Sequence, residues 1–148
     1  IFDLINLLRL TNYRHNIRMK VIKEEIVFNI EASSLWEILS DVTRCDWVPS
    51  VEEIEMIGDC RVFQMDGMGT IKEKIILNDN ENMILKYSAI ETAAPLNHHL
   101  ATMEVIAMEN NCCKLNWRTE IDPEMFADAV HNGMLISIDG IKKVLENN

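Results

Sequence analysis

The sequence predicts an α+β domain in which a curved antiparallel sheet packs against one long C-terminal helix. Between residues 51 and 121 at least five short extended segments are separated by turn residues. Their connections are too short for the crossover helices that parallel neighbours need. The segment that follows has the period of an amphipathic helix. A strongly twisted sheet of this size curls, and a single helix in its concave face covers the core without a second sheet.

Composition excludes several classes of protein. With 148 residues, 48% hydrophobic and 26% charged, the chain has the proportions of one ordinary globular domain. A formal net charge of -10 gives no general electrostatic basis for binding nucleic acid. No uncharged apolar run approaches the roughly 20 residues of a membrane span, so integral membrane insertion is not expected.

The N-terminal charge pattern and the cysteines indicate the compartment. Positive charges follow the apolar run at the N-terminus, whereas a secretory signal has them before it, so a cytoplasmic location is expected. Cys45, Cys60, Cys112 and Cys113 show no CxxC spacing. Free thiols and no metal site are therefore expected. No cofactor is expected either.

Residues 1–18 form an N-terminal extension of uncertain role, and residues 19–148 form a single domain. The extension is apolar and then basic, unlike everything after it. It fits a loosely docked helix, a leader or the product of an upstream start. Residues 21–30 (VIKEEIVFNI) are predicted to form the first strand, because they are rich in β-branched side chains and place Ile22, Ile26 and Phe28 on one face.

Two short helices are expected after the first strand. Ser34 and Glu37 have the spacing of a capping box, in which the serine accepts from a free amide and the glutamate reaches back. A helix should therefore begin there. Thr43 is a candidate cap for a second short helical turn that contains Trp47 and is stopped by Pro49.

The last helix is predicted to start at Asp122 and Pro123, an N-cap followed by proline at the first helical position, and to run to about residue 145. At 100° per residue one side of the helix carries Phe126, Val130, Gly133, Met134, Ser137, Ile141 and Val144. The middle of this stripe, together with the flanking Gly140, is small. Either the helix backbone approaches the sheet closely there, or a hollow remains.

The order of these features resembles the helix-grip superfamily, which includes START lipid-transfer domains, polyketide cyclases/dehydrases and plant abscisic-acid receptors. The residues that carry the resemblance are 36–41 (WEILSD), 47–49 (WVP), 69–75 (GTIKEKI) and 85–88 (LKYS). It covers about residues 20 to 146. It implies a curved seven-stranded sheet that grips the C-terminal helix around an internal ligand cavity. Residues 125–128 (MFAD) are similar to the receptor branch in particular.

Glu73 is the first candidate for chemistry in such a cavity. Period-2 alternation places it with Ile71, Ile75 and Leu77 on the apolar face, where an unpaired carboxylate is costly and tends to hold its proton. The resemblance implies that a glutamate here lines the cavity and anchors ligand. A register bulge or a surface partner such as Lys86 is the alternative.

Tyr87 and His99 are the other polar candidates, one on each of the next two inward rows. They would offer a hydroxyl and an imidazole to an apolar hollow, whereas the adjacent His98 points to the opposite face. The whole set of expected ligand-binding residues is Trp47, Met65, Glu73, Tyr87, His99, Met103, Trp117, Phe126, Val130 and Met134. The resemblance implies that Trp47 lies near the cavity mouth, while Trp117 belongs to an inward row. Filling of the core is the alternative for the tryptophans, and filling of irregular gaps for the methionines.

Three functions remain compatible with these residues. The first is binding, for transport or sensing, of a small hydrophobic or amphipathic molecule such as a lipid, isoprenoid or polyketide-like compound. The second is a polyketide cyclase/dehydrase-type enzyme that uses Glu73, His99 or Tyr87 as acid or base. The third is a partner-binding domain whose cavity is closed by side chains. The sequence leaves the oligomeric state open and is compatible with a homodimer.

Overall fold

The computed structural model describes residues 19–147, so the N-terminal extension predicted at residues 1–18 lies outside the described residues. Seven strands form one sheet in the order β1-β7-β6-β5-β4-β3-β2. The elements are β1 (Lys20–Phe28), α2 (Ala32–Ser40), β2 (Ile54–Ile57), β3 (Cys60–Met65), β4 (Gly69–Asp79), β5 (Ile84–Glu91), β6 (His98–Ala107), β7 (Cys113–Asp122), the 3-10 helix η1 (Glu124–Phe126) and α3 (Ala127–Glu146).

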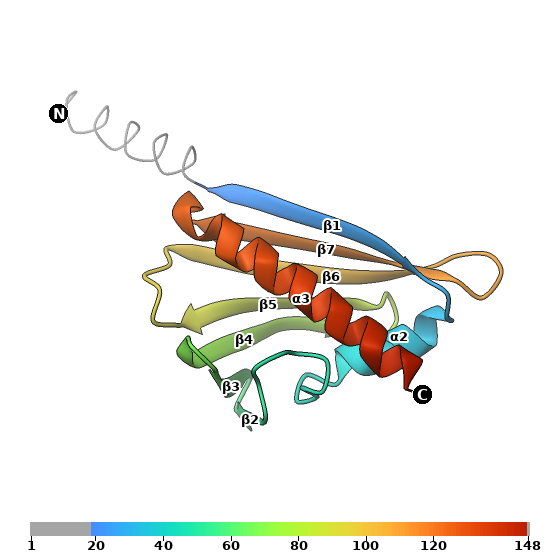
Figure 1. Cartoon of the computed structure of the whole chain (residues 1–148), viewed down its shortest axis with the longest axis horizontal. Coiled ribbons are helices and arrows are strands. Elements are labelled where there is room, and N and C mark those ends of the chain that lie inside the picture. The colour runs from blue at the N-terminus through green and yellow to red at the C-terminus, as the bar shows by residue number, and fades with distance from the viewer. Residues whose placement is uncertain (1–18, 148) are drawn as a thin grey trace.

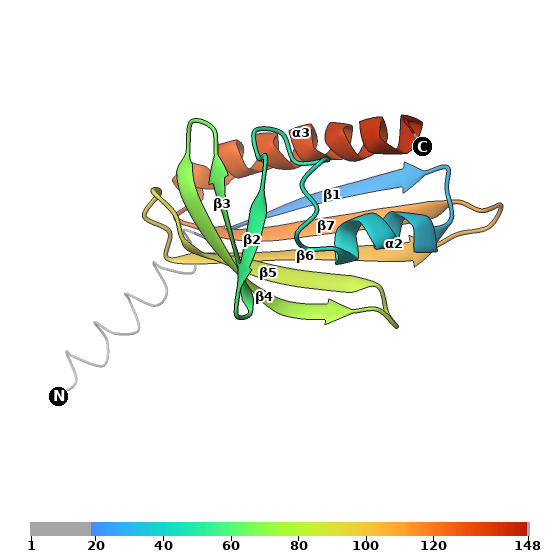
Figure 2. The same ribbon diagram turned by 90° about the horizontal axis from the view of Figure 1, so that it is seen from below.

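The sheet is an antiparallel meander closed on one side by β1, which pairs with β7. Helix α3 lies across one face of the sheet (Figure 1). In the perpendicular view the hairpin between β3 and β4 rises from the sheet toward the level of α3, so the sheet curls around the helix (Figure 2). This arrangement confirms the predicted helix-grip fold.

Alternation along the strands sets the core, as predicted. On β7 the inward row of Leu115, Trp117, Thr119 and Ile121 is at most 5% exposed. Neighbouring Asn116, Arg118 and Glu120 are only partly covered. The main core therefore lies between the concave face, α2 and α3, and a smaller buried cluster is formed by Val51, Phe63 and Ile71.

The alternation fails at one place in β4. Ile71 and Glu73 are buried as expected, but the pairing of β4 with β5 shifts register between Ile75 and Leu77. The bulge takes up Ile76 as an extra residue, and Leu77 is 38% exposed instead of inward. The prediction for Leu77 was wrong because a strict period of two cannot contain a bulge.

The predicted helix starts also need correction after β1. Helix α2 begins at Ala32 after an N-cap at Glu31 that makes no side-chain hydrogen bond, so Ser34 lies inside the helix and forms no capping box. The second short helix is absent from the described chain. In its place are turns, in which the amide of Thr43 donates to Asp41 Oδ1 at 3.2 Å.

The start of α3 differs from the predicted cap as well. Asp122 is the last residue of β7 and is 1% exposed, and Pro123 precedes η1 in extended conformation. The α-helix proper begins at Ala127, with Phe126 in the N-cap position. The Asp-Pro pair therefore lies at the end of a strand here, although the same pair is also typical of the start of a helix.

The small residues of α3 meet two different surroundings. A Cβ added to Gly140 would lie 2.0 Å from the carbonyl oxygen of Trp47, whereas one added to Gly133 would meet nothing within 4 Å. The open space raised as one alternative is therefore present beside Gly133, whereas the close approach to the sheet raised as the other is not made at Gly140. The close approach is made to the loop after α2 and not to the sheet.

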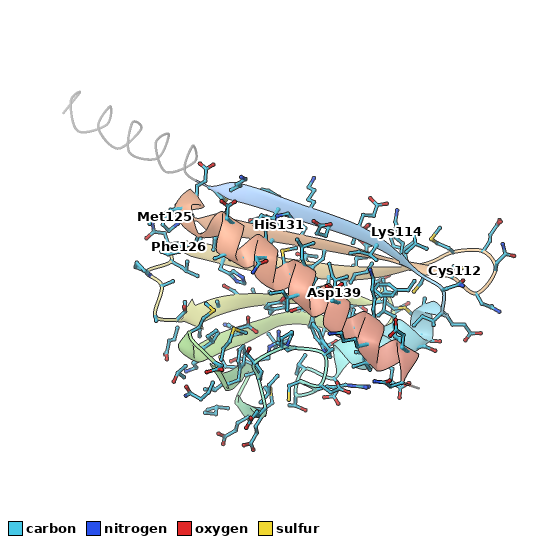
Figure 3. The ribbon with its side chains drawn as sticks, in the orientation of Figure 1. Cys112, Lys114, Met125, Phe126, His131 and Asp139 are labelled. Atoms are coloured by element: carbon cyan, nitrogen blue, oxygen red, sulfur yellow. The ribbon has the colours of Figure 1, made fainter. Side chains whose placement is uncertain are left out.

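Side-chain pairing joins the first half of α3 to β1. His131 Nε2 lies 2.6 Å from Glu24 Oε1, and Figure 3 shows His131 beside β1 while Asp139 occupies the helix face turned away from the sheet.

Among residues 19–147, no helix is long and apolar enough to cross a membrane.

Candidate functional site

A cavity of about 250 Å³ lies between α3 and the concave face of the sheet. Residues of β2 to β7 form its sheet side, and one face of the first half of α3 forms the other. Met68 in the hairpin between β3 and β4, Leu96 in the connection between β5 and β6, and Phe126 at the start of α3 border one end. In Figure 1 these three segments lie at the same end of the domain, and we refer to this end as the mouth of the cavity.

Nine of the ten residues predicted to bind ligand border this cavity: Trp47, Met65, Glu73, Tyr87, His99, Trp117, Phe126, Val130 and Met134. The tenth, Met103, is fully buried in the core and does not border it. Its row on β6 points inward as expected, and β6 also contacts α2. Met103 therefore belongs to the packed part of the core.

Glu73 is paired with Arg61, a residue that sequence reasoning missed. Arg61 Nε lies 2.7 Å from Glu73 Oε1, with side-chain exposures of 8% and 12%. Glu73 is therefore not an unpaired carboxylate, and its partner is Arg61 and not the alternative Lys86. A signal was present, because a hairpin turn centred on Gly67 places residues 61 and 73 opposite each other, as the register of β3 and β4 shows.

Tyr87 lies directly beneath this ion pair. The guanidinium carbon of Arg61 is 4.6 Å from the centre of the Tyr87 ring, and Arg61 Nη1 donates to the carbonyl of Val42 at 3.3 Å. Burial raises the pKa of Tyr87, the charge of Glu73 raises it further, and the charge of Arg61 opposes both. The indole nitrogen of Trp117 is close enough to the hydroxyl to lower this pKa slightly, but makes no hydrogen bond of normal geometry. Tyr87 is therefore a neutral phenol at physiological pH.

His99 on β6 is held in one tautomer by the backbone of the neighbouring strand β5. The amide of Ala89 donates to His99 Nδ1 at 2.9 Å, so the neutral ring carries its proton on Nε2. Burial lowers the pKa of His99, and the neighbouring His98 adds to this, while Glu73 opposes it. His98 faces the other side, as predicted, and lies 2.9 Å from Glu120. His99 thus presents a neutral donor beside the cavity.

Trp47 and Trp117 form an edge-to-face pair at the centre of the cavity wall. Their ring centroids are 6.5 Å apart at 71°, and the residues are 6% and 5% exposed. Both indole nitrogens are buried without a hydrogen-bond partner within residues 19–147. The two alternatives raised for these residues are compatible, since each tryptophan packs in the core and also borders the cavity.

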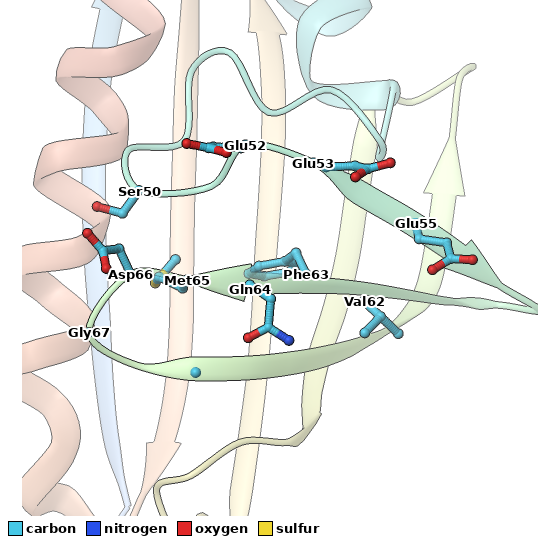
Figure 4. A pocket seen from close by; sticks show the side chains of 11 residues that line it. Ser50, Glu52, Glu53, Glu55, Val62, Phe63, Gln64, Met65, Asp66 and Gly67 are labelled. Atoms are coloured by element: carbon cyan, nitrogen blue, oxygen red, sulfur yellow. The ribbon is translucent and has the colours of Figure 1, made fainter.

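A larger hollow of about 860 Å³ opens at the other edge of the sheet, around β2 and β3. Figure 4 shows Glu52, Glu53 and Glu55 above it and Asp66 at its end. Within the described part of the chain, none of these four carboxylates has a basic partner within 4.0 Å. This acidic groove shares Phe63 and Met65 with the lining of the α3 cavity, and its polar lining side chains are all exposed.

The α3 cavity has a polar side and an apolar side. Its polar groups come from neighbouring strands on the sheet side, Arg61 on β3, Glu73 on β4, Tyr87 on β5 and His99 on β6, while α3 supplies mainly apolar and small side chains. No group of three or more His, Cys, Asp or Glu side chains within residues 19–147 is arranged to hold a metal ion. The cavity has the make-up of a small-molecule site, with an apolar lining and a few polar groups on one side.

Comparison with known proteins agrees with this geometry. A family model described as "Polyketide cyclase / dehydrase and lipid transport" matches residues 19–147. No curated protein sequence gives a significant match.

Solved structures share the fold at low sequence identity. XoxI from Bacillus cereus is similar with a TM-score of 0.76 and 17% identity, over 84% of this chain and 94% of that one. Norcoclaurine synthase from Thalictrum flavum gives 0.73 and 23%, over 90% of this chain and 91% of its own. The Zhui aromatase/cyclase from a Streptomyces species gives 0.69 and 15%, over 86% and 94%.

Proposed function

The chain belongs to the polyketide cyclase/dehydrase and lipid transport family, and from this premise we propose that it binds a small amphipathic molecule in the cavity beneath α3. The observation that carries the proposal is the amphipathic wall of that cavity. A ligand can bury apolar surface against Met134 and Val130 while its polar end lies near Tyr87 and His99. Affinity would come mainly from apolar burial, at about 25 cal/mol per Å² before the costs of ordering.

The volume favours compact ligands over long chains. A cavity of about 150 Å³ holds benzene, which corresponds to roughly 25 Å³ per carbon atom. The 250 Å³ of this cavity then accommodate about ten non-hydrogen atoms by the same scaling. Of the expected ligand classes, a one- or two-ring polyketide-like or isoprenoid compound fits inside, whereas a long acyl chain would extend through the mouth.

The first test is native mass spectrometry of protein purified without detergent, followed by organic extraction. A stoichiometric compact apolar compound is the expected result. A second arm measures thermal shifts with a panel of two-ring compounds on the wild-type protein and on Gly133→Leu. The new side chain enters the open space beside Gly133 and fills the cavity.

Asn132→Leu is the matched control, because this neighbour is exposed on α3 and does not border the cavity. The shifts should disappear in Gly133→Leu and persist in Asn132→Leu. A panel that never shifts the melting temperature of the wild type, together with a ligand-free native mass, would contradict the proposal.

Catalysis of the cyclase/dehydrase type is the second candidate. The observation that favours it is the placement of a carboxylate and two neutral donors on adjacent strands, Glu73 beside Tyr87 and His99. A screen for turnover of polyketide-like substrates would test it. Turnover that is lost in both Glu73→Gln and His99→Gln, with ligand binding retained, would favour the enzyme over the carrier.

A further inference from the structure

The neutral polar groups around the cavity are mainly hydrogen-bond donors that lack an acceptor. His99 Nε2 carries the proton of its neutral ring because Nδ1 already accepts from Ala89. Neither this N–H nor the Tyr87 hydroxyl donates a hydrogen bond to any group within residues 19–147. Both groups remain accessible, since neither is among the fully covered polar atoms that lack a partner. The two rings are neighbours, with centroids 6.1 Å apart.

Two more donors add to the excess. The indole nitrogens of Trp47 and Trp117 are buried and have no hydrogen-bond partner in the described chain. The Trp117 nitrogen lies near the Tyr87 oxygen, which leaves the hydroxyl proton of Tyr87 free to point elsewhere. Hydroxyl groups such as that of Ser137 on α3 can donate or accept and therefore set no preference.

Acceptors and net charge are scarce by comparison. Among the residues that the structure describes, Glu73 is the only carboxylate that borders the cavity, and one of its oxygens is bound by Arg61 at 2.7 Å. The two charges of this pair offset each other, so the cavity has no net charge to attract an ion. A buried donor without an acceptor is costly, and a ligand that supplies an acceptor recovers that cost.

Resting on the proposed function, we propose that Tyr87 and His99 donate to a neutral oxygen acceptor on the ligand, so that the cavity selects compact apolar compounds that carry a carbonyl or similar uncharged oxygen. An apolar compound without an acceptor leaves both donors unpaired. A protonated amine brings further donors and meets Arg61, and a carboxylate finds no uncompensated positive charge. Selection therefore depends on hydrogen bonding and on exclusion of both signs of charge.

The test uses one two-ring frame with four polar ends: tetralin without an acceptor, α-tetralone with a neutral ketone, aminotetralin as a cation and tetralin carboxylate as an anion. Dissociation constants are measured by tryptophan fluorescence and calorimetry on wild type, Tyr87→Phe and His99→Phe. Tyr87→Phe removes only the hydroxyl and keeps the ring under Arg61, so it serves if His99→Phe proves unstable.

We expect the wild type to bind α-tetralone about tenfold more tightly than tetralin and more tightly than either charged compound. The advantage of the ketone should fall several-fold in Tyr87→Phe, with the affinity for tetralin unchanged. Equal affinities for ketone and hydrocarbon, or a preference for the amine or the carboxylate, would overturn the inference and leave cavity binding intact. Failure of all four compounds to bind, with no native ligand found, would instead contradict the proposed function.

Indole resonances give an independent readout of the binding position. The chain has three tryptophans, and Trp36 donates to Asn80 Oδ1 at 2.9 Å, away from the cavity, so it serves as an internal reference. α-Tetralone should shift the indole N–H signals of Trp47 and Trp117 while that of Trp36 stays in place. A shift confined to Trp36, or shifts of equal size at all three residues, would contradict binding at the donors beneath α3.

Discussion

Gly140→Ala tests the close approach of α3 to the loop that contains Trp47. The added Cβ would lie 2.0 Å from the carbonyl oxygen of Trp47, 2.9 Å from its carbonyl carbon and 3.4 Å from its Cα. Carbon atoms in favourable contact are about 3.5 to 4.0 Å apart, so helix and loop must separate by more than about 1 Å. Both partners are backbone, and no flexible side chain can absorb the shift.

The magnitude follows from two opposing effects. Alanine is a better helix former than glycine by about 1 kcal/mol, whereas overpacking of a close contact costs about 1 to 3 kcal/mol and occasionally more. Because the clash at Gly140 is between backbones, we take the upper part of this range and expect a net loss of about 2 kcal/mol. For a domain of this size that corresponds to a fall in Tm of about 4 to 8 °C.

Gly133→Ala is the matched control on the same helix. Its Cβ would meet nothing within 4 Å, so only the helix preference of about 1 kcal/mol remains and the variant should be more stable than wild type. Urea unfolding followed by circular dichroism measures both variants. If Gly140→Ala is as stable as Gly133→Ala, the reasoning about the contact with Trp47 is refuted.

Three further changes have expected outcomes. Glu73→Gln removes the charge that pairs with buried Arg61 and should cost about 3 kcal/mol in urea unfolding. Replacing both partners by apolar residues should recover most of that loss. If the double replacement costs as much as Glu73→Gln, the ion pair is excluded as the cause. The pKa of His99 is lowered on folding, so the unfolded chain takes up the proton first as the pH falls below about 6.5. The contribution of neutral His99 to the free energy of unfolding is therefore complete above that pH and is lost as the pH falls below it. His99→Phe should flatten the plot of Tm against pH between about pH 7 and pH 5. An unchanged plot would assign the loss of stability to other groups. Asn80→Ala leaves the indole of Trp36 without its acceptor and should cost about 1 to 2 kcal/mol and move that indole resonance; a neutral effect on stability would mean that water replaces the amide.

Predictions that used patterns with a fixed period were reliable. Alternation placed Tyr87, Trp117 and Glu73 on the inner face, and the helical stripe placed Met134 against the core, because each depends only on local geometry. Cap and bulge positions were less reliable. The bulge at Ile76 depends on how β4 meets β5, and alternation along β4 alone gives no sign of it.

The partner of Glu73 shows why site chemistry is harder to predict than burial. Alternation indicated that this carboxylate points inward, but its charge state depends on what lies opposite it in the next strand. That partner, Arg61, follows from the hairpin at Gly67 once the register is counted across the turn. The donors at Trp47 and Trp117 had no such signal, because an indole nitrogen is found to lack a partner only when its three-dimensional neighbours are known.

Small residues of α3 determine both the size of the cavity and the contact of this helix with the loop after α2. Gly140 lets the second half of α3 rest on the backbone at Trp47, and this contact also fixes the loop that carries the Trp47 ring into the cavity wall. Ser137 and Gly133, about one and two turns earlier, leave space because their side chains are so small. A larger residue at 133 therefore shrinks the cavity without moving the helix, whereas a larger residue at 140 lifts the helix and displaces Trp47. Ligand size and donor geometry are for this reason separable by substitution on one helix, and a ligand that depends on the donors should lose more affinity from Gly140→Ala than a pure hydrocarbon does.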